Sequence, residues 1–204
     1  MLTIDDGFFS NRHFADTILD SLGIKVLFFI PTEFISCSTS DTQRAFVRER
    51  LFPNVNPPSY WNDLHPLNWS DIHQLKTNGH SFGSHTCSHL RLSSISDAST
   101  IERELIESKH ILQQHIGQEV NSFAFPFGDI GSISQTALRL ACQHYNLIFS
   151  GIRGSNNSNT HPSAILRQSI DTSLPPLYNL GVLSGIINYR YSNARDTLAS
   201  FVGS

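Results

Sequence analysis

The sequence has few charged residues, few cysteines and no long apolar run. Charged residues make up 15% of the 204 residues, against about 25% in an average soluble protein, and the net charge is −3. A chain without a positive excess attracts a nucleic-acid backbone only weakly, so we expect no nucleic-acid partner. The longest apolar run, residues 26–30, is far shorter than the roughly 18 residues that a spanning helix requires. We therefore expect no integral membrane segment.

The three cysteines, Cys37, Cys87 and Cys142, are too few and too scattered for a disulfide framework or for a zinc site made of cysteines alone. This favours a reducing compartment and hence the cytoplasm. The N-terminus also lacks the charged and then apolar pattern of a signal peptide. Because the chain opens almost directly on a motif at residues 2–7, an upstream segment would change the preference for the cytoplasm.

Short apolar segments alternate with segments of helical periodicity, which predicts an α/β fold in a single domain spanning residues 1–204. The expected strands are residues 2–4, 24–30, 80–84, 122–125, 147–150 and 165–170. One expected helix ends near Gly23. Three others cover 70–76, 99–116 and 132–144, and the tail from 177 onward is also expected to be helical. Residues 36–66 predict an irregular insertion with one short helix at about 44–51. Such alternation predicts a parallel sheet or barrel whose functional residues lie at the carboxyl ends of the strands.

Two of these helices carry a clear apolar spacing. Phe14, Ile18 and Leu22 recur at i, i+4 and i+8, which predicts the buried face of the first helix. In the helix at 99–116, a capping box is expected at residues 99–102, and Gly117 occupies the position after the last turn. Its predicted apolar face consists of Ile101, Leu105, Leu112 and Ile116.

Three polar motifs fall at predicted strand ends: Thr-Ile-Asp-Asp-Gly at residues 3–7, Ser-His-Thr-Cys-Ser-His at 84–89 and Phe-Pro-Phe-Gly-Asp at 125–129. The adjacent carboxylates Asp5 and Asp6 repel each other, so their pairing at the end of an apolar strand requires a cation or a raised pKa. A metal would supply that cation. His85 and His89, together with one carboxylate, would make the three-ligand open site that is typical of catalytic zinc.

Each motif also has a structural interpretation. Asp-Asp-Gly is most often a turn, and Phe-Pro-Phe-Gly by itself favours a strand-ending turn with aromatic packing. The spacing of His85 and His89 is weak evidence in a chain with ten histidines. Cys87 fits a small buried residue better than a ligand. It is the order of the three motifs, all at strand ends of one alternating pattern, that favours a functional site.

In this order the motifs resemble those of the polysaccharide deacetylase family, the NodB-homology domain of carbohydrate esterase family four. The similar stretches are residues 3–7, the Phe-Gly-Ser-His-Thr-Cys-Ser-His-Leu-Arg-Leu at 82–92 and the Phe-Ala-Phe-Pro-Phe-Gly at 123–128. Asn-Gly-His at 78–80 and Ile-Pro-Thr at 30–32 are also similar to the family. The resemblance extends over about residues 2–170.

The resemblance implies a distorted (β/α) barrel of about seven parallel strands. It implies a hydrolase that removes N-acetyl groups from an amino sugar, a glycan or a glycolipid intermediate. One divalent metal, zinc first, with cobalt, nickel and manganese as alternatives, would be held by Asp6, His85 and His89. Asp5 would act as the general base that takes a proton from a metal-activated water. The backbone N–H of Phe127 would stabilise the oxyanion.

The chain departs from the family pattern at two points. Many members place an arginine where this chain has Ala124, and that arginine orients the base. Arg167 is a candidate substitute, with a surface arginine on a strand end as the alternative. The family's late Leu-x-x-x-His motif, which supplies the general acid, is not visible, and His161 is the nearest histidine.

Tyr60, Trp61 and Pro126 are the candidate substrate-binding residues of a carbohydrate site, because flat apolar rings pack on pyranose faces. Trp69 is either a further stacking ring or part of the core. Two alternative functions stay open: an O-acetyl esterase or an amidase acting on another C–N bond with the same metal site, and a sugar-binding domain that keeps the motif as a relic. The presence of Asp5 argues against the relic, since a binding site has no need for a base.

Overall fold

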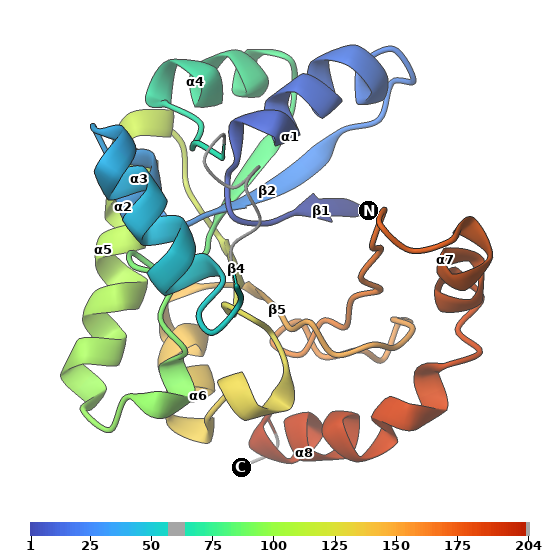
Figure 1. Ribbon diagram of the computed structural model, residues 1–204. Helices are drawn as coiled ribbons and strands as arrows, with labels where there is room; N and C mark the ends of the chain where they lie inside the picture. The colour runs from blue at the N-terminus through green and yellow to red at the C-terminus, as the bar shows by residue number, and fades with distance from the viewer. Residues whose placement is uncertain (57–63, 203–204) are drawn as a thin grey trace. The chain divides into compact units, whose positions relative to one another are not determined.

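The computed structural model describes residues 1–56 and 64–202, and the chain forms two compact units in it (Figure 1). The first unit contains Met1–Leu90 and Arg103–Val120. The second contains Arg91–Glu102 and Asn121–Ser204. Both units combine helices with parallel strands. The predicted α/β fold class is therefore confirmed.

The first unit is built on three parallel strands in the order β1 (Leu2–Ile4), β2 (Val26–Ile30) and β3 (Ser81–Ser84). Ile4 is in register with Phe28, and Ile30 is in register with Ser84. All five residues of the central strand β2 are buried, as expected for the longest apolar run of the chain. Because the strands are parallel, the segments that follow them leave from the same edge.

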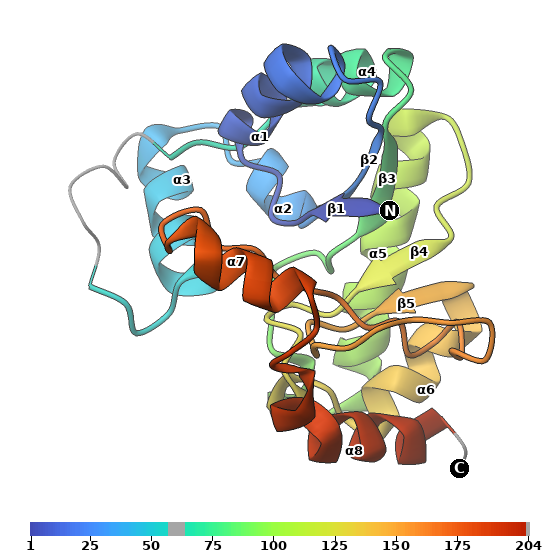
Figure 2. The ribbon, with the colours of Figure 1, turned by 90° about the vertical axis from the view of Figure 1, so that its right-hand side faces the viewer.

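The helices of the first unit are α1 (Phe9–Phe14), α2 (Thr32–Ile35), α3 (Ser40–Phe46), α4 (Trp69–Thr77) and most of α5 (Ala98–Ile116), with π-helical turns at Ala15–Leu19 and Val47–Leu51. Figures 1 and 2 both show α1 beside α4. The Arg12 guanidinium on α1 joins them by donating to the side chains of Asp71 and Gln74 on α4. The predicted insertion at 36–66 also differs in detail: its helical part begins with α3 at Ser40, and the prediction placed it at about 44.

The apolar face predicted for the first helix is wrong. The side chains of Phe14, Ile18 and Leu22 are exposed, whereas Ala15 and Leu19 are buried. A π-helical turn continues α1 here, in which the Asp20 N–H donates to the Ala15 carbonyl, five residues back. Ala15 and Leu19 are themselves four residues apart, so the spacing of four persists, and it is the side of the helix next to the predicted one that is buried.

Two predicted helix starts are also corrected, because an upstream side chain caps each helix. The helix predicted at 70–76 begins at Trp69, with Asn68 as its cap: the Asn68 side chain accepts from the Asp71 N–H at 3.0 Å, and the Asp71 carboxylate accepts from the Asn68 N–H at 2.9 Å. In α5 the Asp97 carboxylate accepts from the Thr100 N–H at 3.0 Å, in place of the predicted box at 99–102. The predicted apolar face of α5 is confirmed, because all four of its side chains are buried.

The second unit contains the parallel pair β4 (Ser122–Ala124) and β5 (Leu147–Phe149). Its helices are α6 (Gln135–His144), α7 (Pro176–Leu183) and α8 (Ser192–Val202), with 3₁₀ turns at Leu92–Ser94, Ile130–Ser132 and Asn188–Tyr191. Figure 2 shows α8 running beside α6. Among the described residues, no helix combines the length and the apolar character needed to cross a membrane.

The strand predicted at 165–170 is absent from the described structure except for a single bridge between Phe149 and Ile165. Backbone bonds continue beside this bridge, since the Ser150 N–H donates to the Ile165 carbonyl and the Arg167 N–H to the Ile152 carbonyl, but side chains bond the backbone around Leu166. The Asn156 amide bonds both the N–H and the carbonyl of Leu166, at 2.9 and 2.8 Å, and Arg167 Nε donates to the Ser150 carbonyl at 2.7 Å. The described residues contain five strands, so the expected count of about seven is wrong.

Substituting Gly128 by alanine is expected to destabilise the fold strongly. Gly128 has φ +66°, and a Cβ there would lie 2.4 Å from the backbone N of Gly151. The left-handed conformation and the clash together are expected to lower the free energy of unfolding by more than about 2 kcal/mol, measured by chemical denaturation. Gly117 is the matched control, because it has φ +69° and a Cβ there would meet no atom within 4 Å. Equal losses for Gly128→Ala and Gly117→Ala would contradict this packing argument.

Candidate metal centre

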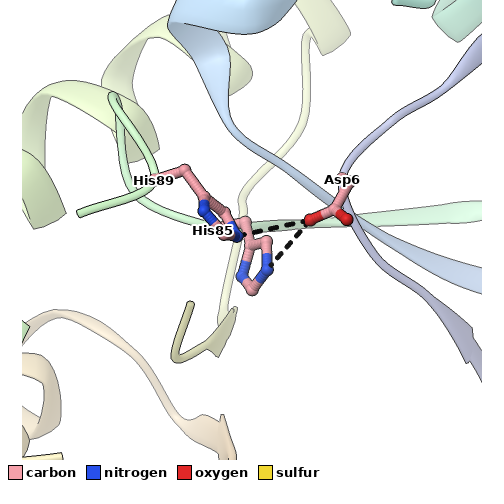
Figure 3. A group of neighbouring side chains, drawn as sticks. All are labelled: Asp6, His85 and His89. Atoms are coloured by element: carbon pink, nitrogen blue, oxygen red, sulfur yellow. Dashed lines mark ion pairs between the residues drawn. The ribbon is translucent and has the colours of Figure 1, made fainter. Parts of the chain in front are cut away.

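The turn after β1 sets the direction of the Asp6 side chain. Asp6 and Gly7 have φ of +71° and +70°, and the Gly7 N–H donates to the Asp5 carbonyl at 3.0 Å. A Cβ on Gly7 would lie only 3.0 Å from the Ile30 side chain, so the turn also requires the small residue. The Asn11 amide holds the same Asp5 carbonyl at 3.2 Å. The chain therefore reverses tightly, and Figure 3 shows the Asp6 carboxylate directed towards the two histidines.

The loop after β3, residues 85–89, carries both histidines. The His85 N–H donates to the Ile30 carbonyl at 3.1 Å, and the Cys87 carbonyl accepts from the Glu33 N–H at 3.0 Å. The loop is thus fastened to the end of β2. Thr86 and His89 have positive φ, and the His89 N–H donates to Thr86 Oγ1 at 3.0 Å. This compact turn brings two histidines four positions apart onto one side (Figure 3).

Asp6, His85 and His89 form a group of side chains spaced for one metal ion. His85 Nε2 lies 3.6 Å from Asp6 Oδ1, and His89 Nε2 lies 3.3 Å from the same oxygen. In a tetrahedral zinc site with bonds of about 2.0–2.1 Å, neighbouring ligand atoms are about 3.3–3.4 Å apart. The two separations from Asp6 therefore fit a zinc-type ion, and all three ligand atoms lie within 4.8 Å of one another. Within the described residues, this is the group of His, Cys, Asp and Glu side chains with metal-ligand spacing.

The surroundings of the two imidazoles also suit a ligand role. Their side chains are only 2% and 4% exposed, so water competes little for them. His89 Nδ1 lies 3.0 Å from the backbone carbonyl of Arg50. Since a carbonyl only accepts, Nδ1 must carry the proton, which leaves the lone pair on Nε2, facing Asp6. This orientation of a histidine by a carbonyl is common around protein-bound metals.

Asp5 lies next to this group without being part of it. Its Oδ2 is 3.9 Å from His85 Nε2, and its side chain is 31% exposed. The three ligand atoms lie within 4.8 Å of one another without any contribution from Asp5. The Asp6 carboxylate therefore belongs to the group of three, and the Asp5 carboxylate lies beside it.

Backbone strain concentrates on the three motifs. Among the described residues, five non-glycine residues have positive φ, and Asp6, Thr86, His89 and Phe127 are four of them. Such conformations are costly for ordinary side chains and persist where the surrounding structure enforces them, often at functional sites. Their distribution supports a functional interpretation of these turns.

In the second unit, the third motif is held by an ion pair and a ring contact. Phe127 has φ +63°, and the Arg91 guanidinium lies 4.5 Å from the centre of its ring. Arg91 also pairs with Asp129 at 2.9 Å, while Pro126 is buried. The backbone at Phe127 is therefore fixed from both sides of the turn.

The remaining predicted residues have varied surroundings. Arg167 is half-buried and bonds the Ser150 carbonyl, so its side chain does not extend freely into solvent. His161 is exposed, and its Nδ1 accepts from the Ser163 N–H. Trp69 stacks on the His115 ring at 3.8 Å. Tyr60 and Trp61 lie outside the described residues.

Cys87 has the environment of a packing residue. Its side chain is buried, and this burial raises the pKa of the thiol to about 12. A metal-binding cysteine requires an accessible thiolate, which this position disfavours. The interpretation of Cys87 as a small buried residue is therefore supported.

Sequence reasoning missed Glu104 and Arg91. Glu104 shares the buried face of α5 with Ile101 and Leu105, three and one residues away, so an acid in phase with an apolar face was the available signal. Arg91 offered no signal of this kind, because its contacts with Phe127 and Asp129 depend on a turn whose conformation is not visible in the sequence.

None of the curated proteins matches the chain. The Streptococcus pyogenes deacetylase PplD, solved in complex with acetate, is 20% identical, with 90% of this chain and 68% of that one covered and a TM-score of 0.69. A de-N-acetylase from Aggregatibacter actinomycetemcomitans is 15% identical, with 89% and 74% covered and a TM-score of 0.67. At these identities the likeness shows a shared fold.

The model of the polysaccharide deacetylase family matches residues 1–145, which include the first strand and all three motifs. The match covers well over half of the 204 residues. The chain therefore belongs to the polysaccharide deacetylase family.

Proposed function

We propose that this protein is a metal-dependent hydrolase that removes N-acetyl groups from an amino sugar within a glycan or a glycolipid intermediate. The observation that carries the proposal is the spacing of Asp6, His85 and His89 beside the separate carboxylate of Asp5. Membership of the polysaccharide deacetylase family supports a carbohydrate as the substrate.

Asp6, His85 and His89 would hold the metal, with zinc as the first candidate and cobalt, nickel or manganese as alternatives. Three protein ligands leave a coordination position open, as catalytic sites require. When bound, a divalent ion supplies Lewis acidity towards an acetyl carbonyl and towards water. The contact of His89 Nδ1 with the Arg50 carbonyl directs Nε2 of this ring towards Asp6 and the proposed metal position.

Asp5 is the proposed general base. Its carboxylate takes a proton from the water that attacks the acetyl carbonyl carbon. The Phe127 N–H is proposed to donate to the oxyanion that forms when the water oxygen adds to the acetyl carbonyl carbon. As the C–N bond breaks, the amine nitrogen takes up a proton, from Asp5 or from water, and acetate leaves. These steps require no further acid, which suits the fact that no late histidine motif is visible in residues 1–204.

Acetate release tests this proposal. Metal-free protein would be incubated with N-acetylated chitin oligomers and with matched O-acetylated sugars, before and after addition of Zn²⁺ or Co²⁺. We expect release from the N-acetylated substrates that depends on added metal. Release from the O-acetylated sugars alone would indicate the esterase. Metal uptake with no release from a broad set of acetylated glycans would indicate the relic.

Arg167 is proposed to hold the Asp5 carboxylate in position with its positive charge. In many family members an arginine at the position of Ala124 has this role. We expect Arg167→Met to lower the turnover number by about 10²-fold, as for other positioned electrostatic groups, without a change in metal content or Tm. Arg153→Met is the matched control, because Arg153 is also half-buried and donates to a backbone carbonyl, that of Ser169. Full activity of Arg167→Met, or an equal loss in the control, would contradict this role.

A further inference from the structure

Glu104 is a buried carboxylate that contacts the histidine loop and has no role in the mechanism above. Its side chain lies on α5, and the residue is 3% exposed. Oε2 accepts from the N–H groups of Cys87 and Ser88, at 3.0 and 2.9 Å. Oε1 accepts from Ser88 Oγ at 2.7 Å. All three donors belong to the segment between His85 and His89.

A carboxylate in this position is costly unless its hydrogen bonds are strong. Removing an ionised group from water is unfavourable, and donors aimed at both oxygens offset that cost. An apolar residue would fill the same face of α5 without this cost of removing a charge from water. The loop, in turn, contains Thr86 and His89 with positive φ, which ordinary residues adopt only when the surroundings enforce it. Glu104 meets that requirement because it binds two consecutive amides between the strained positions.

A second contact ties the same helix to the start of the loop. Ser108, one turn after Glu104, shares a hydrogen bond of 2.7 Å between its Oγ and that of Ser84. Ser84 Oγ also accepts from the Thr86 N–H at 3.2 Å. The loop is thus held by α5 near its first residue and at its centre. Its conformation follows from this helix as well as from β2.

We propose that Glu104 is a positioning residue that fixes the loop 85–89, so that His85 Nε2 and His89 Nε2 face Asp6 before a metal binds. This inference rests on the proposed function in taking the two histidines as ligands. Glu104 itself contacts neither the ligand atoms nor the substrate. Its proposed effect is to reduce the number of conformations that the loop adopts in the metal-free protein, so that both histidines are already in position when the metal binds.

The test compares metal affinity in three variants of Glu104. In Glu104→Leu, which leaves the two amides without acceptors, we expect the Zn²⁺ dissociation constant to rise by about 10–100-fold, the usual effect of losing an outer-shell partner. In Glu104→Gln the amide oxygen still accepts from the loop, so most of the affinity should be retained. Glu104→Asp keeps the charge but shortens the reach, and we expect a loss approaching that of leucine.

The matched control is Glu107→Leu, which removes an exposed acid from the same helix, three residues further along. We expect it to leave the dissociation constant unchanged. Competition with a chromophoric chelator gives the affinities, and the visible spectrum of the Co²⁺-loaded protein reports the ligand geometry. A changed Co²⁺ spectrum in Glu104→Leu, restored in Glu104→Gln, supports positioning and is not expected from a general loss of stability.

Amide hydrogen exchange of Cys87 and Ser88 in the metal-free protein separates this proposal from the proposed function. Faster exchange in Glu104→Leu, or in Glu104→Asp if the leucine variant does not fold, supports positioning even if the wild-type chain binds no metal. If the wild-type chain binds no metal, the proposed function is wrong, but the role of Glu104 in holding the loop is not contradicted. Unchanged exchange and affinity in a folded Glu104→Leu or Glu104→Asp variant would overturn the role of Glu104.

Discussion

Asp6→Asn is expected to abolish metal uptake while leaving the chain folded. Asp6 Oδ1 is the atom that both imidazole nitrogens face, at 3.6 and 3.3 Å. A neutral amide is a much weaker ligand and leaves only two histidines, so we expect the metal dissociation constant to rise by more than about 10²-fold. Asparagine is preferred to alanine because Asp6 has φ +71°, which asparagine tolerates better. Asp6→Ala should lose metal equally, with an added loss of stability.

The measurement is metal content after dialysis against a limiting free concentration of Zn²⁺, together with a titration of the metal-free protein. Asp41→Asn is a suitable control, because the Asp41 side chain is 91% exposed and lies outside the cluster. We expect one metal per chain in the control and none in Asp6→Asn. Full metal content in Asp6→Asn would exclude this carboxylate as a ligand.

Asp5→Asn is expected to separate catalysis from metal binding. Asp5 lies outside the three-ligand group, with its Oδ2 at 3.9 Å from His85 Nε2. An amide cannot accept the proton of the attacking water, so the turnover number should fall by about 10²–10⁴-fold, the range for loss of a general base. Metal content should equal that of the wild type.

The pair of aspartate variants is informative because the two residues are adjacent and chemically identical. Acetate release from an N-acetylated oligomer gives the turnover number, and metal analysis of the same samples gives the occupancy. Equal loss of metal in Asp5→Asn and Asp6→Asn would show that the pair acts as one ligand set. The division into a base and a ligand would then be wrong.

Much of the fold was predictable because it follows from strong, local patterns. The apolar run at Val26–Ile30 and the periodic face of α5 leave little choice of structure. The failures lie where the backbone departs from regular geometry. A π-helical turn at Ala15–Leu19 continues the helix whose buried side was wrongly predicted, and the Asn156 side chain bonds the Leu166 backbone within an expected strand.

The candidate metal centre was predictable to a similar extent. The motif order identified Asp6, His85 and His89, which the structure brings together. The sequence does not reveal the conformation of the turns that carry these side chains. Asp6, Thr86 and His89 have positive φ, but none of them is a glycine, the residue that usually indicates this conformation. The acceptor that orients His89 is the backbone carbonyl of Arg50, which no side-chain pattern can indicate.

The most direct test of the account is the position of a metal in crystals grown with Zn²⁺, located by anomalous scattering at the zinc edge. We predict one strong peak per chain, about 2.0–2.2 Å from Nε2 of both His85 and His89 and bonded to an oxygen of Asp6. Crystals of Asp6→Asn grown in the same way should lack this peak. A fully occupied zinc elsewhere on the chain, with Asp6, His85 and His89 in mutual contact and no metal between them, would contradict the assignment.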